Sequence, residues 1–293
     1  MTTSLACAVP IRHQLLVPAR IVVPVAFALL AVSTSTSIFF LATTCLLLGL
    51  ALGVVTRQAL GSLPTGIDLL EAVSVALAIG LAVSLVVYLV VPAVRLTTLS
   101  ILALVSILLL FTGSTTASSA TGLAATKLFT GLPFGYFPFF VMMGAYWSFL
   151  ELYGQTLDAE SGLAIWLLLS LLSGAVGSTL AGRLPENLWR WVRVVALIAA
   201  ALTGAASYAF AAPVFVGLSI IANGFFLFLF FPLYLTSQGA RAPQAMALYL
   251  VGFAFGGLVG AILIEFGGYT SLSLAILLSP LAVWANPSFG AVS

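Results

Sequence analysis

Charged side chains are scarce in this chain, and their scarcity excludes most soluble folds. Nine lysines and arginines and seven aspartates and glutamates make up 5% of its 293 residues, whereas hydrophobic residues make up 62%. No soluble fold can present so few charges to water. A bilayer requires about 20 apolar residues for each spanning helix, and uncharged apolar stretches of roughly that length separate the charges here. The composition therefore predicts an all-α, polytopic membrane protein.

Histidine and cysteine are equally rare, which excludes several kinds of chemistry. The one histidine, His13, precedes the first apolar stretch, and the two cysteines, Cys7 and Cys45, form no metal-binding motif. Intramembrane serine proteases and metalloproteases need a buried histidine, and aspartyl enzymes need two membrane carboxylates. Asp68 and Asp158 instead lie at the ends of predicted helices. We expect no enzymatic activity, no metal site and no cofactor, and the net charge of +2 gives no sign of a nucleic-acid partner.

The apolar stretches predict about ten membrane-spanning helices. The first, residues 21–55, is too long for one helix, since 35 residues would extend about 52 Å across a hydrocarbon core of about 30 Å. The polar patch at 33–37 is the predicted turn between two spans. The other eight spans are predicted at 67–91, 96–111, 128–150, 162–181, 192–212, 214–235, 245–264 and 269–284.

A polar, low-complexity stretch, GSTTASSATG at 113–122, has the composition of a flexible linker and divides the chain. The predicted organisation is an N-terminal segment (1–20), a four-helix membrane part (21–112), a linker (113–127), a six-helix membrane part (128–285) and a tail (286–293). The segment, the linker and the tail are expected in the cytoplasm.

The basic residues predict the orientation of the spans. With a cytoplasmic N-terminus and ten spans, eight basic residues fall inside and only Arg95 falls outside, which is a strong positive-inside distribution. A nine-span alternative, with 21–55 as one helix, gives six inside and three outside and is less favoured. The eight inside residues are Arg12, Arg20, Arg57, Lys127, Arg183, Arg190, Arg193 and Arg241.

Two aromatic-rich spans, 128–150 and 214–235, contain the candidate solute-binding residues. Aromatic side chains with a polar edge suit amphipathic ligands, and a lone amide inside a span must find a partner on a helix or a ligand. Helix–helix bonding is the commoner role for such an amide, and an interfacial position is the commoner one for the glutamate in this set. The candidates are Tyr146, Trp147, Glu151, Asn223 and Phe226.

Small residues and prolines add a packing pattern. Gly252, Gly256 and Gly260 recur every four residues, so they share one helix face and predict close approach of another backbone. Prolines 133, 138 and 232 are expected to interrupt the aromatic spans and free backbone groups. Broken helices beside a glycine-lined face suit a rocking transporter, although a static bundle also uses them.

The order of these features resembles the C-terminal six-helix half of a major facilitator superfamily transporter. The similarity lies in WSFLELYG followed by an acidic loop, in the basic segment AGRLPENLWRW, and in the short basic loop and glycine-faced helix at 239–260. In the basic segment Glu186 and Arg190 match, whereas Trp189 replaces the usual glycine. By position, the four-helix part corresponds to helices three to six of the family, so the resemblance implies that this chain lacks the family's first two helices.

The resemblance implies transport of a small solute across a plasma or inner membrane by alternating access, with an ion-coupling role open to Glu151, Glu71 or Glu265. The alternative is a non-transporting remnant or an interaction protein that associates with itself or needs a partner to supply the missing helices. The expected surroundings are the lipid bilayer and a small-molecule solute.

The charge distribution generates a test of topology. In a variant without the native cysteines, new cysteines at Asp158 and Arg190 should react with an impermeant thiol reagent from opposite sides of the membrane. Labelling of both positions from the same side would contradict the predicted orientation.

Overall fold

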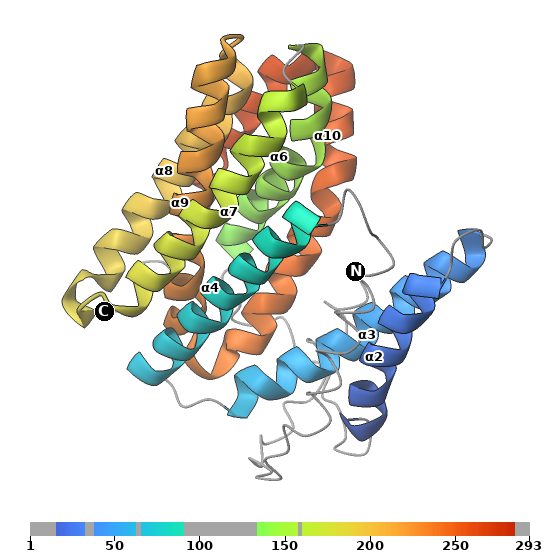
Figure 1. Ribbon diagram of the computed structural model, residues 1–293. Coiled ribbons are helices and arrows are strands. Elements are labelled where there is room, and N and C mark those ends of the chain that lie inside the picture. Colours follow the sequence, from blue (N-terminus) through green and yellow to red (C-terminus); the bar gives the residue numbers. More distant parts are fainter. Residues whose placement is uncertain (1–15, 33–37, 63–65, 91–133, 158–159, 285–293) are drawn as a thin grey trace. The chain divides into compact units, whose positions relative to one another are not determined.

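The computed structural model describes residues 16–32, 38–62, 66–90, 134–157 and 160–284, and every element in these ranges is helical (Figure 1). The chain divides into two compact units. One comprises residues 1–63, 86–132 and 240–247; the other comprises 64–85, 133–239 and 248–293. The predicted span at 96–111 and the linker at 113–127 lie outside the described residues. Residues 64–85, and with them most of the helix at 67–90, belong to the same unit as the C-terminal helices.

The first unit contains a pair of packed helices, α2 (Leu16–Val32) and α3 (Ile38–Ser62). Ala19 and Val23 of α2 and Ala51 of α3 form its small buried core. The predicted turn at 33–37 lies outside the described residues, and the chain is helical on both sides of it.

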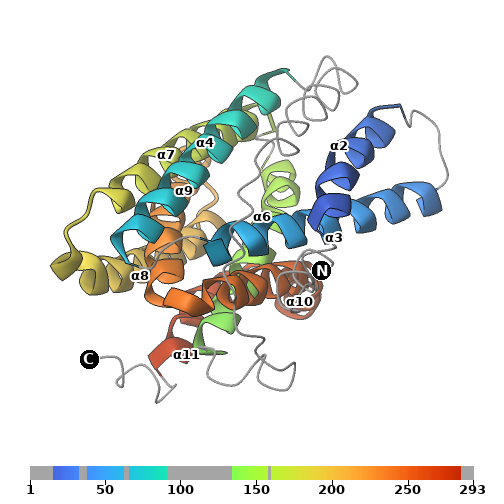
Figure 2. The same cartoon turned by 90° about the horizontal axis from the view of Figure 1, so that it is seen from below.

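The second unit contains α4 (Ile67–Val90), η3 (Phe134–Tyr136), α6 (Phe137–Thr156), α7 (Glu160–Gly182), α8 (Glu186–Ala209), α9 (Pro213–Ser237), most of α10 (Ala242–Leu278) and α11 (Leu281–Trp284); η4 (Gly239–Arg241) precedes α10. Short connections join consecutive helices, so α6 to α9 alternate in direction. Helix α4 lies along α7 in both views (Figures 1 and 2), where the Ser178 hydroxyl donates a hydrogen bond of 2.8 Å to the Ser74 carbonyl.

Helix α10 is a hairpin of two arms that meet at Gly267 and Gly268. Neither glycine has helical backbone angles, and Gly268 has φ +64° and ψ −166°, a conformation that favours glycine. Along the first arm (242–266), Gly252 faces Phe140 and Gly260 faces Phe149, so this arm runs parallel to α6. Along the second arm (269–278), Tyr269 contacts Tyr153, and α11 beyond it reaches η3, at the opposite end of α6. The second arm therefore returns along the bundle.

The helix boundaries agree with the sequence at most positions, but two prolines do not act as predicted. Pro138 occupies the first turn of α6, where its missing N–H breaks no intrahelical hydrogen bond, so it starts this helix rather than interrupting it. Helix α9 continues through Pro232 to Ser237. The prediction that these two prolines interrupt their spans is wrong, although Pro232 still lacks the N–H that would bond to the Phe228 carbonyl. Pro133 lies outside the described residues.

Four helical segments among the described residues are long and apolar enough to cross a membrane: Gly162–Gly182, Glu186–Ala209, Pro213–Ser237 and Gly239–Val283. The last of these contains both arms of the α10 hairpin. Length and composition thus indicate a membrane protein.

Two contacts in the second unit are backbone-to-backbone seams lined by glycine. At the α6–α10 seam, a Cβ added to Gly256 would overlap the backbone of Gly144 and Ala145, and one added to Gly144 would overlap the Phe253 backbone. At the α7–α9 seam, a Cβ on Gly177 would overlap the Phe225 carbonyl, and one on Gly224 would overlap Ser170. Both pairs of helices approach so closely because these positions carry no side chain.

The α6–α10 seam predicts a sharp difference between two adjacent glycines. Gly256→Ala should destabilise the protein by about 1–3 kcal/mol, because its methyl group must displace backbone, and Gly256→Leu should destabilise it at least as much. Gly257→Ala is the matched control, since its Cβ would lie 3.6 Å from the nearest neighbour, the Ser148 hydroxyl. The thermal stability of the purified variants checks this, and equal melting temperatures for Gly256→Ala and Gly257→Ala would contradict it.

Candidate functional site

Tyr146, the first candidate residue, is fully buried on α6 and contacts α8. Its hydroxyl lies 3.3 Å from the Ser207 hydroxyl, and its own backbone carbonyl accepts a hydrogen bond from the Tyr208 hydroxyl. The Tyr146 ring packs edge-on against Tyr208, with ring centroids 5.8 Å apart. Tyr146 therefore connects α6 to α8 through both its side chain and its backbone.

Asn223 of α9 is also fully buried and also contacts α8. Its amide nitrogen donates a 2.7 Å hydrogen bond to the Ala200 carbonyl, whereas its carbonyl oxygen is buried without a hydrogen-bond partner among the described residues. Around Gly204, one turn further along α8, lie the Asn223 amide, Met143 of α6 and Ile276 of the second arm. Asn223 thus joins two helices at a point where four meet.

Tyr146 and Asn223 lie along one face of α8 rather than around a common centre. Their contacts on α8, Ser207 and Ala200, are seven residues apart, which is about two turns or 10 Å along the helix axis. Tyr146 links α6 to α8 and Asn223 links α9 to α8, so the two residues make separate polar contacts and do not surround a common centre.

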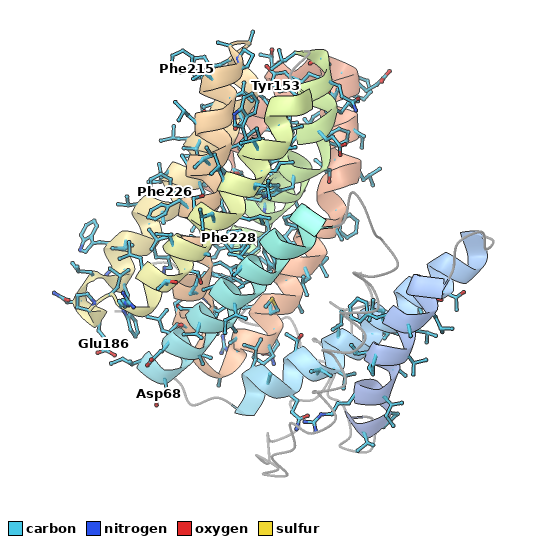
Figure 3. All side chains as sticks on the ribbon, in the orientation of Figure 1. Asp68, Tyr153, Glu186, Phe215, Phe226 and Phe228 are labelled. Atoms are coloured by element: carbon cyan, nitrogen blue, oxygen red, sulfur yellow. The ribbon has the colours of Figure 1, made fainter. Side chains whose placement is uncertain are left out.

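The other three candidates are less buried, and none of them shares the contacts of Asn223 among the described residues. Trp147 is half-buried, with its ring 5.3 Å from that of Tyr146. Glu151 is exposed. Phe226 is half-buried against Phe225 and lies at an edge of the helix bundle (Figure 3).

Tyr153, Tyr208 and Tyr269 form a cluster that the sequence did not predict, at the end of the bundle where α6 and α8 finish. The Tyr208 and Tyr269 rings are stacked 5.6 Å apart, and the Tyr153 ring lies 4.7 Å from that of Tyr269. The Tyr153 hydroxyl donates to the Phe210 carbonyl at 3.0 Å, and nearby the Ser273 hydroxyl donates to the Ala205 carbonyl at 2.8 Å. The hydroxyls of Tyr153, Tyr208 and Ser273 thus all donate to backbone carbonyls at this end of the bundle.

The opposite end, near Glu186 (Figure 3), contains a second aromatic cluster with a different character. Tyr234 of α9 is fully buried, and the centroid of its ring lies 4.9 Å from that of Tyr136 and 5.1 Å from that of Phe140. Its hydroxyl has no hydrogen-bond partner among the described residues. Arg193 of α8 is half-buried. Its Nε atom is also buried without a partner in the described part of the chain. The sequence could have suggested Arg193 only through its position inside an apolar helix.

Within the described ranges, no group of three or more histidine, cysteine, aspartate or glutamate side chains could hold a metal ion. No protein-family model matches this chain, and no curated protein matches it.

The geometry of Asn223 predicts a structural effect of its removal. Asn223→Ala should lower the free energy of unfolding by about 0.6–2 kcal/mol, because the interhelical hydrogen bond to Ala200 is lost. Asn187→Ala, at an exposed position near the start of α8, is the control and should leave the melting temperature unchanged. If Asn223→Ala abolished solute binding while the melting temperature stayed the same, the amide would serve a ligand instead of the fold.

Proposed function

We propose that this protein transports a small solute across a plasma or inner membrane by alternating access, with about ten spans in an arrangement like that of the major facilitator superfamily. The support comes from the contact pattern of the second unit, combined with the apolar helices and the sequence resemblance. The substrate passes near the middle of the bilayer, between the N-terminal and C-terminal parts of the chain.

The observation that carries this proposal is an inverted relation between two successive groups of three helical segments. The first group is α6, α7 and α8; the second is α9 and the two arms of α10. The segments alternate in direction, so the first group begins in one direction and the second begins in the other. Inverted three-helix repeats of this kind occur within each six-helix half of major facilitator transporters.

Three contacts keep this relation when each segment is exchanged for its counterpart, whereas the hydrogen bonds of Tyr146 between α6 and α8 have no matching hydrogen bond between α9 and the second arm among the described residues. Here α6 corresponds to α9, α7 to the first arm, and α8 to the second arm. The contact between α6 and the first arm therefore corresponds to the contact between α9 and α7, and both are glycine-lined seams. The α8–α9 contact, which includes the Asn223 hydrogen bond, becomes the contact of the second arm with α6, which includes the Tyr153–Tyr269 pair. The contact of α8 with the second arm, at Ser273 and Ala205, is unchanged by the exchange, because these two segments are each other's counterparts.

The contact between α4 and α7 is where the moving surfaces are expected. Helix α4 comes from the N-terminal part of the sequence, and α7 comes from the six-helix part. Gly182 of α7 lies against Ser74, and the Ser178 hydroxyl bonds to the Ser74 carbonyl. Alternating access requires one part to rock against the other, and this contact between the two parts changes when they do.

A second candidate function is an interaction protein that does not transport. It is favoured by the tight packing around Tyr146 and Asn223, whose contacts in the structure are with other helices. In that case solutes would neither bind nor cross, while the bundle would remain stable.

Two disulfide locks separate these functions. Ser74→Cys/Gly182→Cys joins α4 to α7, at positions where a Cβ on Gly182 would lie 2.9 Å from that of Ser74. Ala145→Cys/Gly260→Cys joins α6 to the first arm, at a corresponding distance of 3.0 Å. Both distances are shorter than the usual value of about 3.8 Å, so each lock requires the same small shift.

A solute is first selected by its effect on the melting temperature, and its counterflow into proteoliposomes is then measured. Oxidation should stop counterflow through the α4–α7 lock, reduction should restore it, and the α6–α10 lock should have no effect. Absence of counterflow for every stabilising solute would contradict transport, and equal inhibition by the two locks would contradict movement at the α4–α7 contact.

A further inference from the structure

Helix α6 exposes polar side chains along its second half, unlike its neighbour α7. The exposed residues of α6 from position 148 onward are Leu152 and four polar ones, Ser148, Glu151, Gln155 and Thr156. Helix α7 instead exposes a stripe of aliphatic residues at helical spacing: Ile165, Leu169, Leu172, Val176 and Leu180. An aliphatic stripe suits lipid, whereas a carboxylate and an amide on a helix surface suit water or a polar ligand. The exposed part of α6 is therefore a different kind of surface.

Trp147 and Glu151 lie one turn apart on this part of α6. Side chains four residues apart on a helix have Cβ atoms about 6 Å apart and stand on the same side. Glu151 is exposed, and Trp147 is half-buried with its ring edge-on to that of Tyr146, at a centroid distance of 5.3 Å. Tyr146 is itself fully buried, so this contact holds the indole in place. One ligand can therefore reach the indole and the carboxylate together.

There is room for a ligand beside these two residues. Ser148, next to Trp147 in the chain, is exposed, and its hydroxyl donates a 2.8 Å hydrogen bond to the Gly144 carbonyl, which leaves its oxygen able to accept. Beside it on the first arm of α10 is Gly257, where an added Cβ would meet only the Ser148 hydroxyl oxygen, at 3.6 Å. The surface beside Ser148 is thus open.

The charges of the second unit are segregated, and Glu151 is at the negative end. Arg183, Arg190 and Arg193, the described basic residues of this unit, lie where α7 ends and α8 begins. Glu151 lies near the opposite end, where α6 finishes, as does Glu265, which is exposed beside the turn of α10. The described part of this unit therefore offers no basic side chain to pair with Glu151, and the field at this end favours a cation.

The chemistry of the two side chains selects one class of ligand. A carboxylate only accepts hydrogen bonds and attracts positive charge, and the face of an indole ring also attracts a cation, above all an alkylated ammonium group. An organic ammonium ion satisfies both groups, whereas a hydrated inorganic cation gains from the carboxylate alone. A neutral or anionic ligand would leave the charge of Glu151 unbalanced.

We propose that Trp147 and Glu151 form a binding site for an organic ammonium ion on the surface of α6. The Glu151 carboxylate balances the positive charge, the indole of Trp147 packs against the alkyl groups on the nitrogen, and the open position at Gly257 accommodates the rest of the molecule. The identification of this cation as the transported solute rests on the proposed function, whereas the site itself does not.

The test uses the full chain in micelles of a non-ionic detergent, with tetramethylammonium chloride as the probe and sodium chloride at the same concentration as the reference. A ligand that binds the folded state raises the melting temperature with its concentration. The wild type should gain more from tetramethylammonium than from sodium. Glu151→Gln should weaken the apparent affinity about tenfold or more, because it removes the balancing charge. Trp147→Leu should weaken it about two- to fivefold, because it removes the aromatic face.

Glu265→Gln is the matched control, because it removes the same charge from an exposed position at the same end of the unit. The residue one turn before it is Ala261 rather than an aromatic one, so this variant should bind like the wild type. Glu151→Gln changes an exposed side chain without changing its size, so the test still stands if Trp147→Leu does not fold.

Three results would overturn the proposal: equal stabilisation of the wild type by sodium and tetramethylammonium, a wild-type response of Glu151→Gln, or equal weakening by Glu151→Gln and Glu265→Gln. Counterflow of radiolabelled tetramethylammonium into proteoliposomes is measured separately. Binding without counterflow would uphold the site and contradict transport of this cation, so the site and the transport function can fail independently.

Discussion

The second unit depends on how closely the backbones of α6 and α10 approach at Gly144 and Gly256. Inside a bilayer, apolar side chains gain little by leaving lipid for protein, so helices associate mainly through close packing and interhelical hydrogen bonds. The missing side chains at these two positions allow the first arm of α10 to lie directly on α6. That contact fixes the height at which the hairpin turns, and it therefore places Tyr269 beside Tyr153 and Ser273 beside Ala205. A bulkier residue at the seam would shift all of these contacts together.

The two ends of the second unit differ in how their polar groups are satisfied. Where α6 and α8 finish, the hydroxyls of Tyr153, Tyr208 and Ser273 each donate to a backbone carbonyl. Where α8 begins, the Tyr234 hydroxyl and the Arg193 Nε have no such partner among the described residues. Buried groups without a partner in the described part of the chain also occur away from this end, at the Asn223 carbonyl oxygen and the Ser170 hydroxyl, so the second unit satisfies its buried polar groups most fully where α6 and α8 finish.

Sequence alone located the helices well, because hydrophobic length and charge position depend on each segment by itself. The predicted spans at 162–181 and 214–235 differ from α7 and α9 by only one or two residues at each end. The regular spacing of Gly252, Gly256 and Gly260 also indicated a packing face. It could not name the partner helix, since a periodic pattern shows which side of a helix is special and not what covers it. For the same reason the partner of Asn223, the Ala200 carbonyl, appears only once α8 and α9 are placed together.

The α10 hairpin also bears on how the chain enters a membrane. Between Ala242 and Trp284 the only charged residue is Glu265, which lies just before the two glycines of the turn. If both arms cross a membrane, only the Glu265 carboxylate has to cross with them. Their insertion would then be driven by the apolar surface of both arms and opposed by a single charge.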